Sequence, residues 1–268
     1  MIRTGRLLRQ SVFFLSYYYK KISIIVSKKE LCYSYLMKIT IIHGQSHKGS
    51  TYHIARAVAE KAGGENSEIT EYFLPRDFGS LCLGCTQCFW NDKSKCPHYA
   101  SLAPITNALM EADLIILASP VYVYHVTGAM KAFLDHYGYM WMAHRPEEAM
   151  FKKQGLCVST AAGAGMKSTN KDMADSLFFW GVAKTYKLGF AVSALNWESV
   201  DEKKKLKIER KVNAVAKSIR KNNGKIKPGF KTKAFFFLMH LLERNGWNKA
   251  DVDYWYEKGW CGNKRPWK

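Results

Sequence analysis

The sequence has no long apolar run. Its most apolar early segment, residues 11–19, ends at Lys20 and Lys21, so it is too short to span a bilayer. A secretory signal peptide would need a small-residue cleavage site after such a segment, and the two lysines stand there instead. We therefore predict no transmembrane segment and no signal peptide.

The sequence also lacks the even cysteine set of a secreted disulfide scaffold. It contains seven cysteines in 268 residues. Four of them lie within residues 82–96, and Cys32, Cys157 and Cys261 are scattered. This distribution is typical of reduced thiols, and it predicts a cytoplasmic protein.

Acidic residues are few. The chain has 41 Lys or Arg against 22 Asp or Glu, a formal net charge of +19. Residues 1–36 hold seven basic residues and one acid, and residues 222–268 hold ten and four, which makes +6 in each end. A basic surface can attract nucleic acid, but no recognised nucleic-acid motif accompanies it. We expect a solvated basic surface and no specific nucleic-acid partner.

Composition divides the chain into three parts. Residues 1–36 form a basic N-terminal extension, which we expect to lie outside the fold, because a strong strand pattern starts directly after Met37. That extension could also result from the choice of start codon. Residues 37–221 form an α/β domain. Residues 222–268 form a basic, aromatic C-terminal extension.

Strand and helix patterns alternate through residues 37–221. Apolar, β-branched runs predict five strands, and the run at residues 112–119 is apolar on both faces, as in a central parallel strand. The predicted strands are 38–43, 68–74, 112–119, 155–160 and 187–194. The predicted helices are 52–61, 102–110, 127–137, 170–184 and 199–221. This order predicts a doubly wound parallel sheet that binds its ligand at the carboxyl ends of the strands.

The C-terminal extension is too aromatic for a disordered linker. It carries a helical pattern at residues 232–244, followed by Trp247, Trp255, Trp260 and Trp267. We expect it to pack on the domain or on a second subunit. The alternative is a place at a membrane interface, because the helix is aromatic and basic but short.

The loop at residues 43–51 lacks both common nucleotide patterns. It is neither G-x-G-x-x-G nor a P-loop, and residues 163–168 fail the P-loop spacing because Met166 precedes Lys167. These absences disfavour binding of a nucleoside triphosphate. The first loop does offer hydroxyl groups and one lysine at a helix N-terminus, which suits a phosphate monoester. The alternative is a helix that is merely capped.

A second loop follows the central strand, at residues 119–124. Pro120 ends the pairing of that strand, and Tyr122 and Tyr124 can lie flat against an aromatic ligand. Alternatively, both tyrosines are core residues of the next helix. Gly163 and Gly165 would let the following turn approach the same ligand closely.

The four clustered cysteines lie in an unusually long loop, residues 75–97. The spacing C-x-x-C-x-x-C brings three thiols within reach of one centre, which suits soft-metal or redox chemistry. Three interpretations stay open. The loop could hold an iron–sulfur cluster, could act as a structural or redox-active thiol loop, or could close a tetrahedral zinc site.

These motifs, in this order, resemble the NADPH-dependent FMN reductase family, which is flavodoxin-like in fold. The resemblance covers residues 37–221 and rests on the phosphate loop at 44–51, the Cys-Gly-Cys loop at 83–88, and residues 119–122 followed by 131–135. It implies that the FMN phosphate is held by Ser46, Lys48, Ser50 and Thr51. It also implies that the isoalloxazine is bordered by Pro120, Val121, Tyr122 and Val123, and on its other edge by Thr160, Ala161, Gly163 and Gly165. One departure is that many relatives carry an arginine in the first loop, where this chain has Lys48.

In its cysteine loop the chain also resembles the iron–sulfur flavoproteins. Those proteins ligate a 4Fe–4S cluster with a compact run of four cysteines, which here are Cys82, Cys85, Cys88 and Cys96. Other flavin reductases of this type have a similar loop without a cluster. The resemblance therefore leaves the content of the loop open.

The function expected from these features is an FMN-dependent oxidoreductase of the flavin or quinone reductase type. It would take hydride from NADPH or NADH and pass electrons to a small-molecule acceptor or a redox protein. No catalytic residue is assigned, because the flavin carries the chemistry. We expect a homo-oligomer, a dimer or tetramer. The alternatives are an electron-carrier iron–sulfur flavoprotein that does not use nicotinamides, and a cysteine-rich metal-binding module.

Overall fold

A parallel sheet of five strands forms the centre of the part of the chain that the structure describes. The structure is a computed structural model, and it describes residues 36–65 and 67–268. The predicted N-terminal extension therefore lies outside the described residues, apart from Leu36. The strands are β1 (Lys38–His43), β2 (Glu68–Phe73), β3 (Leu114–Pro120), β4 (Gln154–Ala161) and β5 (Lys184–Ala191).

The strand order is β2-β1-β3-β4-β5, and every neighbouring pair is parallel. This is the order of a flavodoxin-like, doubly wound sheet, so the predicted fold class is confirmed. Central β3 is buried along its first six residues, as its apolar sequence predicts. Edge strand β2 is mostly half-buried and carries two glutamates.

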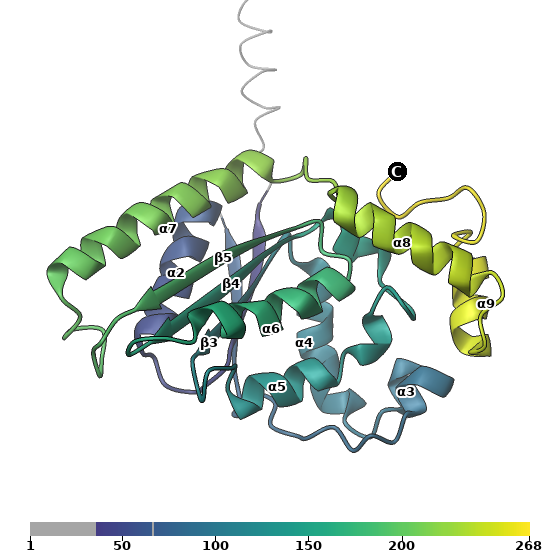
Figure 1. Cartoon of the computed structure of the whole chain (residues 1–268), viewed down its shortest axis with the longest axis horizontal. Coiled ribbons are helices and arrows are strands. Elements are labelled where there is room, and N and C mark those ends of the chain that lie inside the picture. Colours follow the sequence, from purple (N-terminus) through teal and green to yellow (C-terminus); the bar gives the residue numbers. More distant parts are fainter. Residues whose placement is uncertain (1–35, 66) are drawn as a thin grey trace, which may run out of the picture. The chain divides into compact units, whose positions relative to one another are not determined.

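Helices cover both faces of the sheet (Figure 1). One apolar core joins the sheet to α2 (Ser50–Gly63) and α7 (Glu202–Asn222). The core on the other face joins it to α4 (Tyr99–Glu111), α5 (Gly128–Asp135) and α6 (Met166–Phe179). The short elements are α3 (Gln87–Trp90), η1 (Lys93–Lys95), η2 (Gly138–Met140) and η3 (Glu148–Lys152).

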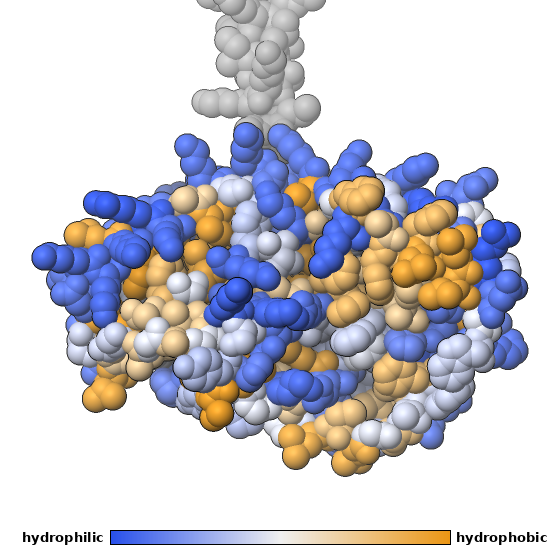
Figure 2. Space-filling view, in the orientation of Figure 1, coloured by the Kyte–Doolittle hydropathy of each residue, from blue (hydrophilic) through white to orange (hydrophobic). Residues whose placement is uncertain are grey.

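The C-terminal segment forms two further helices, α8 (Phe230–Glu243) and α9 (Lys249–Glu257). Phe236, Trp255 and Trp260 are buried against Met142 and Phe151, so the segment packs on the α/β domain. The outward face of α8 stays apolar and exposed, as Figure 2 shows. No described helix is both long enough and apolar enough to cross a membrane.

Candidate functional site

Three loops meet at the carboxyl edge of the sheet, where the doubly wound fold binds its ligands. They follow β1, β3 and β4. The hydroxyl oxygens of Thr51 and Thr160 lie 2.6 Å apart and share a hydrogen bond. The backbone N–H of Val121 donates to the carbonyl of Thr160 at 2.9 Å. The fold therefore brings together the three segments that the sequence singled out.

The first loop leads into an uncapped helix. The N-cap of α2 is Gly49, no side chain in the described part of the protein caps it, and its first turn holds no acidic residue. Ser50 is buried at this helix end, whereas Ser46 and Lys48 are exposed in the loop before it. Free N–H groups and the positive end of the helix dipole favour an anion here. This end of α2 can therefore accept a phosphate group.

The loop after β3 makes a tight two-residue turn. Tyr122 and His125 exchange two backbone hydrogen bonds of 3.0 Å, and the two residues between them, Val123 and Tyr124, have φ of 47° and 66°. A positive φ is common in such turns for glycine or asparagine but strained for a β-branched valine. The side chain of Val123 is 92% exposed. Strain of this kind collects at ligand-binding sites.

The two tyrosines of this turn are surface residues. Tyr122 is 51% and Tyr124 63% exposed, and α5 begins only at Gly128. The alternative that they belong to the core of the next helix is therefore wrong. Their rings are free to contact a flat ligand at this edge.

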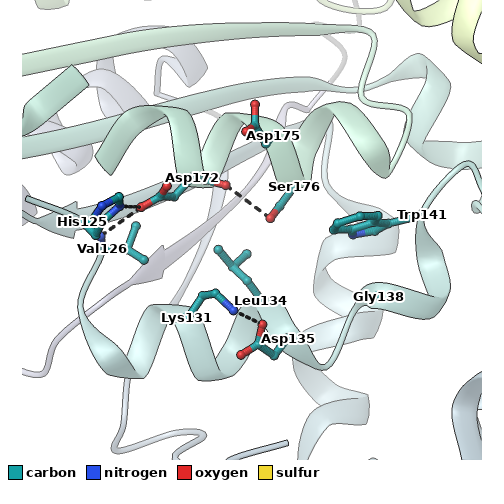
Figure 3. Close-up of a pocket in the computed structure, with 10 residues that line it drawn as sticks. All are labelled: His125, Val126, Lys131, Leu134, Asp135, Gly138, Trp141, Asp172, Asp175 and Ser176. Atoms are coloured by element: carbon teal, nitrogen blue, oxygen red, sulfur yellow. Dashed lines mark hydrogen bonds and ion pairs between the residues drawn. The ribbon is translucent and has the colours of Figure 1, made fainter. Parts of the chain in front are cut away.

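A groove of about 420 Å³ opens beside the turn, between α5 and α6 (Figure 3). His125 lies at one end, where its Nδ1 and Asp172 Oδ2 are 2.9 Å apart. Trp141 lies at the other end and stacks on Phe179, with ring centroids 4.3 Å apart. The groove can hold a partly aromatic molecule next to the turn. It is lined by His125, Val126, Lys131, Leu134, Asp135, Gly138, Trp141, Asp172, Asp175 and Ser176.

The four predicted metal-binding cysteines line a single small cavity of about 60 Å³. Its other walls include Asp135 and His136, at the C-terminal end of α5. Burial, and after it the nearby thiols of Cys96, Cys82 and Cys85, together raise the pKa of the Cys88 thiol to about 11. Thiolates are soft donors, so this set of four thiols suits soft-metal or iron–sulfur chemistry.

The cysteine cavity and the turn lie at opposite ends of one helix. The turn precedes the N-terminus of α5, and His136 follows its C-terminus. Eight helical residues span about 12 Å. Asp135 lines both the cavity and the groove, so the groove runs from one site toward the other.

Side chains from distant segments fix the cysteine loop. Arg145 donates to the carbonyl oxygens of Cys88, Phe89 and Asn91. Its Nε lies 3.3 Å from an oxygen of Asp251, a residue of α9 that is 2% exposed. The C-terminal segment therefore supports the loop through an ion pair.

Comparison with known proteins assigns the family. A sequence profile of NADPH-dependent FMN reductases matches residues 37–196. The chain belongs to this family. The resemblance that the three motifs indicated is thereby confirmed, and the protein is a flavodoxin-like FMN oxidoreductase of this family.

Individual relatives agree with this assignment. The chain is similar to an iron–sulfur flavoprotein of Archaeoglobus fulgidus, with 27% identity over 231 residues that cover 83% of this chain and 99% of the relative. An iron–sulfur flavoprotein of Methanocaldococcus jannaschii is 31% identical over 100 residues, which cover 37% of this chain and 51% of that protein.

Two solved structures share the fold. One is a flavone reductase, with a TM-score of 0.51, 17% identity, and coverage of 69% of this chain and 62% of that one. The other is an FMN-dependent NADH-azoreductase from Bacillus anthracis in complex with FMN, with a TM-score of 0.51, 11% identity, and coverage of 68% and 99%. At these identities they support the fold alone.

Several residues outside the predicted site hold the turn after β3. Gln45 Oε1 accepts a hydrogen bond of 2.6 Å from the hydroxyl of Tyr122. Asp172 holds His125, and Ser168 Oγ donates to the carbonyl of Tyr124. These partners are separated by 44 to 77 positions along the chain, so no local pattern could reveal them.

Thr127 is a further residue that sequence reasoning missed. Its hydroxyl donates to the carbonyl of Gly44 at 2.6 Å and accepts from the N–H of Met130 at 3.1 Å, which caps α5. A Cβ on Gly44 would lie 3.0 Å from this hydroxyl oxygen, which explains a glycine there. The available signal was a threonine at the start of the predicted helix 127–137, a position where threonine is a common cap.

Proposed function

We propose that this protein takes hydride from NADPH or NADH and passes the electrons to a small-molecule acceptor or a redox protein. The observation that carries the proposal is the convergence, at the carboxyl edge of the sheet, of an uncapped helix N-terminus and a strained, exposed turn. Family membership supports FMN as the group bound there. When bound, FMN supplies the hydride and electron transfer chemistry.

The residues of the first loop suit the phosphate end of FMN. The N–H groups at the start of α2 and the hydroxyl of Ser50 can donate to phosphate oxygens, and Lys48 adds positive charge. The proposed phosphate ligands remain those that the sequence indicated: Ser46, Lys48, Ser50 and Thr51.

The two other loops suit the flat ring. Contacts with Gln45 and Asp172 fix both sides of the turn after β3. Such preorganisation lowers the entropy cost of binding. The proposed ring contacts are Pro120, Val121, Tyr122 and Val123, with Thr160, Ala161, Gly163 and Gly165 on the other edge. The groove beside His125 gives the second substrate a place next to the ring.

A second candidate function is supported by the cysteine cavity. Four thiols that line one cavity suit an iron–sulfur cluster, and two relatives carry the name iron–sulfur flavoprotein. On this alternative, Cys82, Cys85, Cys88 and Cys96 hold a 4Fe–4S cluster, and the protein carries electrons without using nicotinamides.

Anaerobic reduction of the flavin tests the proposal. The purified full chain, loaded with FMN, should lose its flavin absorbance when NADPH or NADH is added, and a quinone should restore it repeatedly. A flavin that dithionite bleaches but neither nicotinamide does would contradict the reductase and support the carrier. Light scattering on the same sample measures the predicted dimer or tetramer.

A further inference from the structure

Two histidines and one cysteine form a compact group inside the cysteine cavity. The ligand atoms of Cys96, His98 and His136 all lie within 4.8 Å of one another. His136 is 5% exposed, and the other two are half-buried. The group joins the end of the cysteine loop to the residue that follows α5, so the fold brings it together from two segments.

The hydrogen bonds of His136 decide which of its ring nitrogens faces the group. Its Nδ1 lies 2.7 Å from the carbonyl oxygen of Ala132, which can only accept, so Nδ1 carries the proton. In the neutral ring, Nε2 then presents its lone pair toward His98 Nδ1, 3.0 Å away. A metal-binding histidine usually has this arrangement, with the far N–H bonded to a carbonyl.

The separations suit one small ion. Around a tetrahedral zinc ion, two histidine nitrogens lie about 3.4 Å apart, and a nitrogen and a thiolate sulfur about 3.6 Å apart. In the structure, His98 Nδ1 and His136 Nε2 lie 3.0 Å apart, and the three ligand atoms of the group lie within a limit of 4.8 Å of one another. A small outward shift of His98 would admit the ion. Within residues 36–65 and 67–268, no trio drawn from the four cysteines alone meets that limit.

We propose that Cys96, His98 and His136 bind one divalent transition-metal ion of the zinc class. A thiol of the same cavity, such as that of Cys88, or a water completes the tetrahedron. Imidazole and thiolate are the ligands that zinc takes in its mixed sites. Since Cys96 would also be a ligand of a four-thiol cluster, the ion and such a cluster exclude each other.

Titration with Zn²⁺ or Co²⁺ alone tests this site. The full chain is stripped of metal with a chelator under reducing, anaerobic conditions and loaded with FMN. We expect binding of one ion per chain by calorimetry. With Co²⁺ we expect d–d absorption of four-coordinate strength, at wavelengths longer than those of the flavin. His98→Gln and His136→Gln should each lower the affinity by more than about 100-fold, because loss of a direct ligand exceeds the loss of a supporting one.

Matched variants separate this site from a four-thiol site. Cys85→Ser should keep the affinity for Zn²⁺ or Co²⁺ within a few-fold of that of the unmodified chain, whereas Cys96→Ser should abolish binding of the ion. His53→Gln, at a half-buried position of α2 outside the cysteine cavity, is the control for the histidine replacements. Unchanged affinity in both His98→Gln and His136→Gln would overturn the proposal, and would leave the two rings as a hydrogen-bonded support of the loop.

Equal losses in Cys85→Ser and Cys96→Ser, with no effect of the histidines, would overturn it in favour of four thiol ligands. Because His136 is buried, its replacement by Gln could prevent folding. In that case the metal affinity of the His98→Gln variant, at a half-buried position, decides between the two outcomes. The FMN content of every variant reports separately on the flavin site. Failure of the metal proposal is thus distinguishable from failure of the proposed reductase function.

Discussion

Ser50 and Thr51 both begin α2 and are both buried, yet their hydroxyls serve different purposes. Thr51 is bonded to Thr160 and so joins two loops. Replacing Thr51 would disturb the contact between loops as well as any contact with phosphate. Ser50 is therefore the cleaner probe of the phosphate site.

We predict that Ser50→Ala weakens FMN binding by about tenfold or more, since a hydrogen bond to a charged group contributes about 1.5–3 kcal/mol. Riboflavin has no phosphate, so its weaker binding should not change. Titration of the apoprotein by flavin fluorescence measures both affinities. Ser101→Ala, in the first turn of α4, is the control, because that hydroxyl donates to a carbonyl at the start of its own helix. Equal losses for FMN and riboflavin would contradict the assignment.

For single residues, the sequence could indicate the hydroxyl-rich loop but not the side chains to which the loop is hydrogen-bonded. Hydroxyls, glycines and a helix start are adjacent in the sequence, so their combination is visible there. The bond from Tyr122 to Gln45 joins residues 77 positions apart and exists only after the sheet has formed. The positive φ of Val123 could not be predicted either, because glycine and asparagine, not valine, are the residues that indicate such a turn.

Among the secondary structure elements, apolar periodicity located all five strands, and local turns shifted their ends. β5 begins at Lys184, three residues before its predicted start. The predicted helix before it ran to residue 184, but α6 ends at Phe179 and Gly181 makes the turn with φ of 91°. A Cβ at Gly181 would lie 2.7 Å from the ring of Phe151. The sequence could not show this close approach of Phe151, which only a glycine at the turn allows.

The C-terminal segment shows a dependence between elements that composition did not reveal. Its tryptophans predicted packing, and Trp255, Trp260 and Trp267 do pack, whereas Trp247 is 80% exposed and α9 itself was not predicted. Through Asp251, α9 holds Arg145, which binds the backbone of the cysteine loop. Asn248 also donates to the carbonyl of Phe89 at 3.0 Å. The geometry of the thiols thus depends on the last fifth of the chain.

We predict that Asp251→Asn loosens the cysteine loop while FMN affinity is kept. The replacement removes one charge of a buried ion pair, so the charge of Arg145 is no longer compensated. If the free energy of local opening of the cysteine loop falls by about 1.4 kcal/mol, half-buried Cys88 is exposed about tenfold more often. Thiol labelling followed by peptide mass spectrometry measures the rate at Cys88. Asp253→Asn, on the same helix but exposed and paired with Lys249, should leave that rate unchanged. A Cys88 rate equal in the two variants would refute the dependence.

For the whole molecule, the fold class follows from the order of its elements. Alternating strands and helices require crossovers, and crossovers in a parallel sheet bring the strand ends, with their loops, to one edge. The sequence could therefore predict the edge of the sheet at which the three candidate loops meet. It could not predict the groove between α5 and α6, because those two helices are separated by β4 in the chain and meet only in the folded protein.

The fold also buries a charged side chain, and this burial lowers the free energy of unfolding of the whole chain. Lys153 is 6% exposed, and its Nζ donates to the carbonyl oxygens of Met110 and Ala112 at 2.7 and 2.5 Å. Burial lowers the pKa of this lysine from 10.5 to about 8, although nearby Asp113 and Glu111 act in the opposite direction. The folded state therefore binds the proton more weakly than the unfolded state does.

This difference sets the sign of a pH dependence. Below about pH 8 both states carry the proton, and the cost of burying the charge is present in full. Between about pH 8 and 10.5 the unfolded state holds more protons than the folded state, so the free energy of unfolding gains a contribution that rises with pH. Its total size is on the order of 3 kcal/mol.

We predict that Lys153→Met removes this rise in the free energy of unfolding. Urea unfolding at pH 7, 8, 9 and 10 would measure the change as a flatter pH profile than that of the unmodified chain. Lys152→Met, at the exposed neighbouring position, should keep the original slope. Parallel profiles for Lys153→Met and the unmodified chain would show that Lys153 keeps its ordinary pKa in the folded protein.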